Sequence, residues 1–132
     1  MMLDRDESAL HAVQLSLTRR ALLDTDDVIL CDIRDACAVR TVFAARQPEV
    51  VFHAAALKHL PMLEQYPSEA IKTNIDGTRN VLEAAHATGV DTFVNISTDK
   101  AANPASVLGY SKRIAEKITA DVAKEALVDG GG

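Results

Sequence analysis

The sequence predicts a three-layer α/β fold with a parallel β-sheet. Short apolar runs alternate along the chain with segments whose apolar residues recur at helical spacing. The apolar runs show no strict alternation with polar residues, which is typical of strands that helices cover on both faces. Strands and helices that alternate at this length favour parallel pairing through right-handed crossovers. We expect four strands, which end near Asp4, Ile33, Ala55 and Ser97.

The first half of the chain is expected to hold two strands and two helices. A very short apolar start ends at Asp4, and apolar residues at helical spacing predict a helix over residues 7–17. The apolar run over residues 28–33 predicts a buried strand. Asp35 can cap the next helix, because its side chain can accept a bond from a free amide of the first turn.

The second half repeats this order with longer helices. Residues 50–55 predict the third strand, and residues 67–87 predict a helix that begins at a proline and ends before a glycine. Residues 92–97 predict the fourth strand. Ser106 can cap a last helix that runs to about Leu127.

Length and composition limit the possible functions. The chain has 132 residues, enough for one domain, which we place at residues 1–127 before a disordered tail over residues 128–132. A formal net charge of −5 without a basic patch argues against a nucleic-acid partner. No apolar run approaches the roughly 20 residues of a membrane span. The cysteines and histidines lack metal-ligand spacing, and we expect a cytoplasmic chain without a metal.

The segment 97–112 carries the most informative chemistry. Thr98, Asp99 and Lys100 place a hydroxyl, an acid and an amine side by side at the end of a strand, where parallel α/β sheets bind ligands. Lys112 follows one loop later. Proton transfer to and from a sugar or an alcohol needs such groups within hydrogen-bond reach. The alternative interpretation is a capped turn with a surface ion pair.

The ends of the other strands suggest a nucleotide site. Asp4 and Asp32 each end a strand, and an acid in this position can hold the hydroxyls of a ribose. The small residues 54–56 after the third strand let a flat ligand lie close to the backbone. Alternatively, the two acids cap turns or helices, and residues 58–59 form a solvated loop.

At these residues the chain resembles the extended short-chain dehydrogenases/reductases, and most of all the polysaccharide-biosynthesis (CapD-like) nucleotide-sugar 4,6-dehydratases. The similarity extends to about residue 124 and depends on several linked motifs in the family's order. These motifs are Asp4-Arg5-Asp6-Glu7, Asp32-Ile33-Arg34-Asp35, the stretch from His53 to Pro61, Lys72-Thr73-Asn74 before Gly77-Thr78, and Ser97-Thr98-Asp99-Lys100 before Asn103-Pro104.

The resemblance implies a Rossmann-like, doubly wound parallel sheet that is incomplete in this chain. In the family, a first strand lies between the strands that end here at Asp4 and Ala55, and its glycine loop cradles a pyrophosphate. The sequence contains no Gly-x-Gly-x-x-Gly motif. We therefore expect an interior part of a larger enzyme, which would be a homo-oligomer and could be anchored to a membrane through a preceding region.

The resemblance also implies a cofactor, NAD or NADP, and a nucleotide sugar of the UDP-N-acetylhexosamine type as substrate. Residues that would contact the cofactor are Asp4 and Arg5 at the adenosine ribose, Asp32 and Ile33 at the adenine, then Ala54, Ala55, Ala56, Lys58 and Thr73, and Lys112 at the nicotinamide ribose.

The same resemblance assigns catalytic roles to Thr98, Asp99, Lys100 and Lys112. A hydride would leave sugar C4, water would be eliminated across C5 and C6, and the hydride would return to C6. Asp99 would protonate the departing C6 hydroxyl, and Lys100 would take the C5 proton. One position departs from the superfamily pattern, because Leu108 stands where a tyrosine usually precedes Lys112 by four residues. Tyr110, two residues away, points in another direction on a helix.

Two classes of function follow from these observations. The first is a segment of a nucleotide-sugar dehydratase, or of an epimerase of the same group. The second is a non-catalytic remnant or a dinucleotide-fold module without enzyme activity. The absence of a glycine loop favours the second for the chain by itself, which we expect to bind NAD(P) weakly or not at all. The Thr98-Asp99-Lys100 cluster favours the first for the parent protein.

Overall fold

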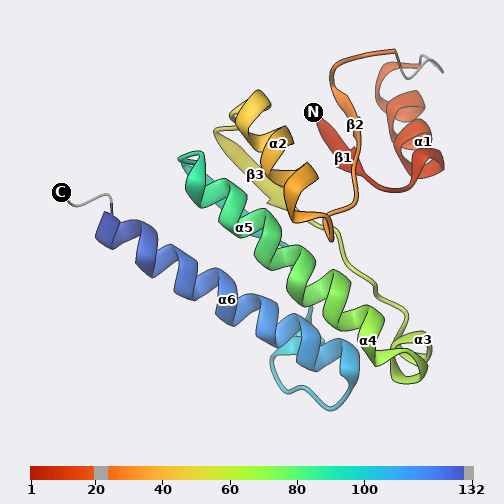
Figure 1. Ribbon diagram of the computed structural model, residues 1–132. Coiled ribbons are helices and arrows are strands. Elements are labelled where there is room, and N and C mark those ends of the chain that lie inside the picture. Colours follow the sequence, from red (N-terminus) through yellow and green to blue (C-terminus); the bar gives the residue numbers. More distant parts are fainter. Residues whose placement is uncertain (20–23, 130–132) are drawn as a thin grey trace.

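The computed structural model describes residues 1–19 and 24–129 and has the alternating order that the sequence predicts (Figure 1). Its elements are β1 (Met2–Asp4), α1 (Glu7–Thr18), β2 (Val28–Leu30), α2 (Ala36–Arg46), β3 (Val50–His53), α3 (Leu60–Gln65), α4 (Pro67–Ala70), the π-helical segment η1 (Ile71–Gly77), α5 (Thr78–Ala87), β4 (Thr92–Asn95), the 3₁₀ turn η2 (Asp99–Ala101) and α6 (Val107–Asp129). Of the predicted tail, residues 128–129 belong to α6 and residues 130–132 lie outside the described residues.

All strand pairing is parallel, as predicted, but the strands form two separate two-stranded sheets. β1 pairs with β2, and β3 pairs with β4. The last three strands end earlier than predicted, although the ladders continue by one bond beyond them. The amide of Cys31 donates to the Asp4 carbonyl, and the amide of Ile96 donates to the His53 carbonyl, both at 2.9 Å. The carboxyl ends of the two paired strands therefore lie side by side in each sheet.

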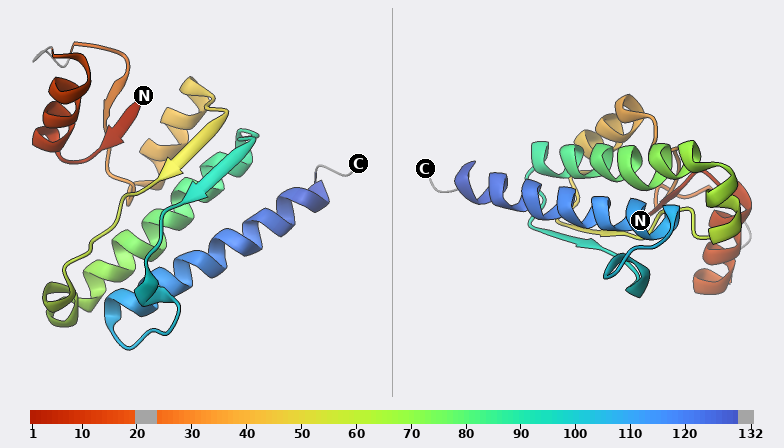
Figure 2. Two further views of the ribbon diagram at one scale, coloured as in Figure 1. Left: turned by 180° about the vertical axis from the view of Figure 1, so that it is seen from behind. Right: turned by 90° about the horizontal axis from the view of Figure 1, so that it is seen from below.

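Three helices cover one face of the β3–β4 sheet. Figure 2 shows α2, α5 and α6 on the same side of these strands. The core between them consists of Cys31, Ile33, Val39 and Phe43 with Val81, Ala84 and Ala85 of α5, and Val51 and Phe93 pack against it from the sheet. The opposite face of β3 is open, because 72% of Phe52 and 49% of Val50 are exposed.

The segment predicted as one helix over residues 67–87 is continuous but irregular. It winds as a π-helix over Ile71–Gly77, and the short helix α3 before it was not predicted. The irregular segment lies close to the strand ends. A Cβ atom on Gly77 would lie 2.6 Å from Cδ1 of Ile33, so glycine permits this close approach. Within the described residues, no helix has both the length and the apolar character that crossing a membrane requires.

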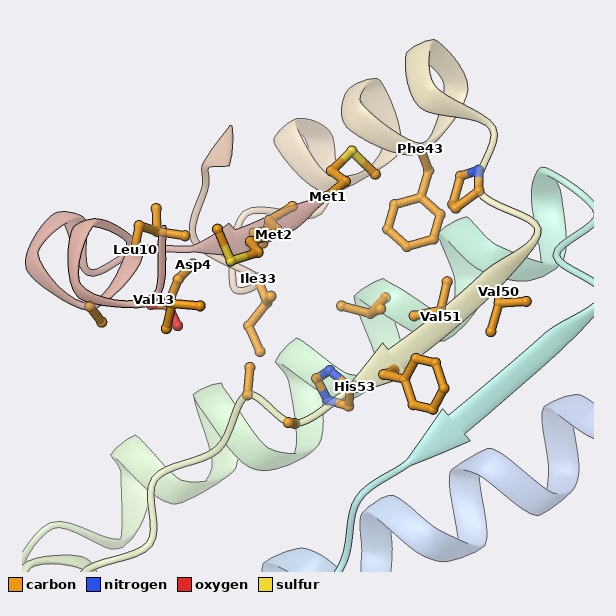
Figure 3. Close-up of a pocket in the computed structure, with 17 residues that line it drawn as sticks. Met1, Met2, Asp4, Leu10, Val13, Ile33, Phe43, Val50, Val51 and His53 are labelled. Atoms are coloured by element: carbon orange, nitrogen blue, oxygen red, sulfur yellow. The ribbon is translucent and has the colours of Figure 1, made fainter. Parts of the chain in front are cut away.

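A cavity of about 450 Å³ separates the two sheets (Figure 3). It lies between β1 and β3, whose facing edges pair with no other strand of the described chain. Leu10 and Val13 of α1, Phe43 of α2 and Val81 of α5 add apolar side chains to its walls. β1, β3 and β4 run in the same direction (Figure 2). The cavity occupies the place where the resemblance puts a further strand.

We expect the 132-residue chain to self-associate through these edges. Unpaired, apolar strand edges recruit other chains. Each buried unpaired backbone group costs roughly 1–3 kcal/mol, against a net stability of about 5–15 kcal/mol for a domain. Light scattering should show oligomers, and hydrogen exchange should be fast over residues 1–19. Phe52→Lys, on the open face, should reduce the association. A monodisperse wild-type monomer with slow exchange throughout β1 and α1 would contradict this expectation.

Candidate nucleotide and acid–base site

The predicted residues of the adenosine end surround one small cavity. The cavity has a volume of about 110 Å³ and lies beyond the ends of β1 and β2. Its lining consists of Leu3, Asp4, Arg5, Cys31, Asp32, Ile33, Ala55, Ala56, Leu57 and Thr73. Ala54 lines the larger cavity between the sheets, and Lys58 lines a third cavity of about 280 Å³ that also contacts Arg5. The predicted cofactor residues of β1, β2 and β3 thus lie around adjoining spaces.

The two carboxylates at this small cavity have different partners. Oδ1 of Asp4 accepts a bond from the amide of Asp6 at 2.8 Å, which fixes the side chain at the strand end. Asp32 accepts from the amide of Arg34 at 2.9 Å and lies 3.5 Å from the guanidinium of Arg5. Partial burial would raise the pKa of Asp32, but the hydrogen bonds and charge of Arg34, with the charge of Arg5, lower it. Asp32 is therefore a carboxylate that two arginines hold in place.

One buried hydroxyl in the same cavity has no partner. Thr73 is 7% exposed, and its Oγ1 makes no hydrogen bond to any described residue. Leaving a buried polar group unpaired costs free energy, so native structures rarely retain one without a function. A ligand with polar atoms in this cavity would pair the Thr73 hydroxyl. The residues present therefore fit a nucleotide, which combines ribose hydroxyls with a polar base.

The acid–base cluster occupies the turn after β4. The hydroxyl of Thr98 donates to Oδ1 of Asp99 at 2.9 Å, and Nζ of Lys100 lies 4.0 Å from the same oxygen. The Asp99 side chain is 93% exposed, and that of Lys100 is 53% exposed. The hydrogen bond from Thr98 and the charge of Lys100 lower the pKa of Asp99. The same arrangement also fits the alternative interpretation, a capped turn with an exposed ion pair.

Lys112 reaches the same region from α6. Its Nζ donates to the carbonyl of Ile96 at 2.9 Å, just after β4. Burial lowers the pKa of Lys112, and the nearby Glu116 acts in the opposite direction. The helix approaches the turn closely, because a Cβ atom on Gly109 would lie 2.7 Å from the Lys100 carbonyl oxygen. The predicted catalytic residues are therefore neighbours, beyond the carboxyl end of β4, while the small cavity lies beyond the carboxyl ends of β1 and β2.

Leu108, at the usual tyrosine position, and Tyr110, two residues later, have different surroundings. Leu108 is 4% exposed and packs with Leu63 and Ala70. Tyr110 is 57% exposed on the surface of α6. Leucine has no hydroxyl, and Tyr110 stands two residues from Lys112, so the two side chains point in different directions from the helix.

Sequence reasoning gave no role to several polar residues around the site, two of which, His53 and Ser97, stand in the quoted motifs. Oγ of Ser97 donates to Oε1 of Glu116 at 2.5 Å, and this bond, with the neighbouring Arg113, lowers the pKa of Glu116. The position of Glu116, four residues after Lys112 on one helix, is a signal that could have found it. His53 is 6% exposed and contacts Oγ1 of Thr78 at 2.9 Å, and no spacing rule indicates that contact.

Known proteins with similar sequences include one named for polysaccharide biosynthesis and one named as a nucleotide-sugar dehydratase. The chain is 41% identical over 128 residues to "Probable polysaccharide biosynthesis protein EpsC" of Bacillus subtilis, covering 94% of this chain and 21% of that protein. It is 44% identical over 87 residues to "UDP-N-acetylglucosamine 4,6-dehydratase (inverting)" of Campylobacter jejuni, covering 66% of this chain and 25% of the enzyme. The chain thus spans about a fifth to a quarter of the length of these relatives.

Solved structures with the same fold include enzymes of nucleotide sugars. Pen from Bacillus thuringiensis superposes with a TM-score of 0.79 at 30% identity, covering 93% of this chain and 36% of that one. UDP-glucose 4-epimerase from Thermotoga maritima, solved with UDP-glucose, superposes with a TM-score of 0.72 at 28% identity, covering 83% of this chain and 39% of that one. WbmG from Bordetella bronchiseptica, solved with NAD, superposes with a TM-score of 0.66 at 25% identity, covering 79% of this chain and 38% of that one.

The fold is therefore that of the Rossmann-type enzymes predicted from the sequence, present here in part. A family model described as polysaccharide biosynthesis protein matches residues 1–129. This chain belongs to the polysaccharide biosynthesis protein family.

Proposed function

We propose that the chain supplies the adenosine-binding half and the acid–base residues of an NAD(P)-dependent nucleotide-sugar 4,6-dehydratase. The observation that carries this proposal is the contact of the Thr98–Asp99–Lys100 turn with the helix of Lys112. This turn follows the carboxyl end of β4, and the small cavity lies beyond the carboxyl ends of β1 and β2. The similarity to a UDP-N-acetylglucosamine 4,6-dehydratase supports the reaction and the substrate class.

The nicotinamide cofactor, when bound, supplies the acceptor and later the donor of a hydride. Asp4, Asp32 and Thr73 would hold its adenosine end, and Ala54, Ala55, Ala56 and Lys58 would border the rest of it. Lys112 would hold the nicotinamide ribose, since its ammonium projects to the end of β4.

In the reaction itself, Asp99 gives a proton to the departing C6 hydroxyl of the sugar, and Lys100 accepts the proton from C5. The Thr98 hydroxyl orients Asp99 through their 2.9 Å hydrogen bond. In the structure Asp99 is exposed and its pKa is lowered, so it is a carboxylate at neutral pH. A substrate that excludes water from this turn favours the neutral form of both groups, so that a proton passes from the ammonium of Lys100 to Asp99. Asp99 then holds the proton that it donates, and Lys100 is the neutral amine that accepts the C5 proton.

A 4-epimerase of the same fold is the second candidate, because a solved neighbour is a UDP-glucose 4-epimerase. The adjacency of an acid and an amine at Asp99 and Lys100 favours the dehydratase, since elimination needs one group to give a proton and another to take one.

Product analysis tests this choice. The complete gene product that carries this chain would be incubated with UDP-N-acetylglucosamine and NAD, and the sugar product analysed by mass spectrometry. The dehydratase assignment predicts a product that has lost one water. A product of unchanged mass with inverted C4 would establish the epimerase, and no conversion of UDP-N-acetylhexosamines would support a non-catalytic module.

We expect Asp4 to favour NAD over NADP. Its carboxylate can accept hydrogen bonds from both ribose hydroxyls and would repel a 2′-phosphate, while Arg5, which could attract one, lies 3.5 Å from Asp32. Asp4→Ala should weaken 5′-AMP binding about tenfold, the equivalent of one hydrogen bond to a charged group, and should not weaken binding of 2′,5′-ADP.

Ligand titrations followed by NMR would measure both affinities. Glu7→Ala, in the first turn of α1, removes a nearby acid without reaching the cavity and is the matched control. A wild-type preference for 2′,5′-ADP would show that Asp4 does not select the cofactor.

A further inference from the structure

Two side chains at the carboxyl end of β4 bind the same helix. Nδ2 of Asn95, the last residue of the strand, donates to Oγ1 of Thr119 on α6 at 3.0 Å. Two positions later, the hydroxyl of Ser97 donates to Oε1 of Glu116 at 2.5 Å. Both side chains therefore face α6, as expected for positions two apart in an extended segment. The bond from Ser97 is the last of these contacts before residues 98–100, which we call the acid–base turn.

The main chain between these two residues is tied to the same helix. The amide of Ile96 makes the bond to His53 that extends the ladder beyond β4, and its carbonyl accepts from Nζ of Lys112 at 2.9 Å. The helix positions that bind this segment are 112, 116 and 119, and the spacing i, i+4 and i+7 places them in one stripe along α6. The chain that leaves β4 therefore lies along a polar stripe of this helix.

Glu116 has a separate partner for each of its oxygens. Oε1 accepts from Ser97, and Oε2 accepts from Nη1 of Arg113 at 3.2 Å, one turn earlier on α6. The hydrogen bond from Ser97, and then the guanidinium of Arg113, lower the pKa of Glu116, so the group is a carboxylate at neutral pH. Hydrogen bonds to an ionised acceptor are shorter and stronger than bonds between neutral groups. The bond to Ser97 is of this stronger kind.

The acid–base turn has no comparable anchor of its own in the described part of the chain. The amides of residues 101–102 donate to the carbonyls of residues 98–99 at 3.1 Å, and the other hydrogen bonds described for the turn also stay within it. Internal bonds shape a turn but do not place it against the rest of the molecule. Its place therefore depends on the anchored Ser97 before it and on the close approach of Gly109 to the Lys100 carbonyl.

We propose that Glu116 is a positioning residue, which holds Ser97 against α6 and so sets the place of the acid–base turn relative to Lys112. Without this bond, the segment after the ladder is free to move away from the helix, and Asp99 and Lys100 move with it. The consequence for catalysis rests on the proposed function, because these two groups must reach neighbouring carbons of one sugar.

Hydrogen exchange of the complete gene product, without substrate and followed by mass spectrometry, tests the anchor itself. Ser97→Ala and Glu116→Ala should each make residues 98–102 exchange about tenfold faster, with exchange in β3 and α5 unchanged. The double variant should exchange no faster than either single variant, because all three lose the same bond. Ser97→Thr keeps a hydroxyl and Glu116→Gln keeps an accepting oxygen, so both should exchange like the wild type.

Arg113→Ala is the matched control, because it removes the other partner of Glu116 and leaves the bond to Ser97 in place. Exchange over residues 98–102 should therefore stay at the wild-type rate in this variant. If Arg113→Ala accelerates exchange as much as Ser97→Ala does, the ion pair on α6 is responsible and the proposed role is wrong. Unchanged exchange in both Ser97→Ala and Glu116→Ala would overturn it as well.

Kinetics of the complete gene product with UDP-N-acetylglucosamine then measure the consequence for the reaction. Ser97→Ala and Glu116→Ala should lower kcat about tenfold and leave KM unchanged, since the turn carries the reacting groups and not the nucleotide contacts. Glu116→Gln should restore kcat. A raised KM with unchanged kcat would contradict a positioning role at the turn. If the wild type converts no UDP-N-acetylhexosamine, the proposed function fails, while the exchange data still decide whether Glu116 positions the turn.

Discussion

Asp99→Asn and Lys100→Ala are each expected to lower the rate of water elimination by about 10²–10⁴-fold, the usual contribution of a general acid or base. Asparagine at position 99 can still accept the hydrogen bond from Thr98 but cannot give a proton to a departing hydroxyl. Alanine at position 100 removes the amine that would take the C5 proton. Both side chains are exposed, so neither change should alter the stability of the fold.

The measurement is the rate of product formation from UDP-N-acetylglucosamine by the complete gene product, with each variant compared at saturating cofactor. Tyr110→Phe is the matched control, because Tyr110 is 57% exposed and stands two residues from Lys112. Its rate should stay close to that of the wild type. Loss of turnover in Tyr110→Phe, with activity retained in Asp99→Asn, would assign the proton transfer to Tyr110 on α6 and not to Asp99.

Lowering the pH from 6.5 to about 4 is expected to remove about 3 kcal/mol from the free energy of unfolding through His53 alone. Burial, and then the charge of Lys112, lower the pKa of His53 from 6.5 to about 4. The unfolded chain therefore binds a proton in this range that the native chain does not. The contribution is complete above pH 6.5, falls as the pH decreases, and is lost below about 4.

Denaturant unfolding at a series of pH values measures this effect. His53→Gln should flatten the pH dependence, because a neutral amide can still donate to Thr78 without titrating. His59→Gln, which changes an exposed histidine, is the control and should keep the wild-type slope. If the free energy of unfolding falls equally steeply with decreasing pH in His53→Gln and in the wild type, protonation of another group causes the loss of stability in acid.

Local patterns predicted most of the elements. Asp35 caps α2 by accepting from the amide of Ala38, and Ser106 caps α6 by accepting from the amide of Gly109, as their positions in the sequence indicate. The parallel direction followed from the alternation of strands and helices. The helix α3 was not predicted, because its six residues are too few to show helical periodicity.

Contacts between distant segments could not be predicted in the same way. No local pattern encodes the separation of the strands into two sheets, but it agrees with the resemblance, which places a further strand between those that end near Asp4 and Ala55. Asp4, Asp32 and Thr73, which the resemblance assigns to the cofactor, line one cavity. The bonds of Asn74 to Leu57 and Ser111 join residues 17 and 37 positions apart, so neither strand nor helix spacing indicates them.

The most direct measurement follows the hydrogen on sugar C4. The complete gene product would receive UDP-N-acetylglucosamine deuterated at C4, and NMR would locate the label in the product. If Asp99 and Lys100 carry out elimination while a nicotinamide moves the hydride, the deuterium should appear at C6 of a 4-keto-6-deoxy sugar. Deuterium retained at C4 of an epimerised or unchanged sugar would contradict the assignment of this chain to a 4,6-dehydratase.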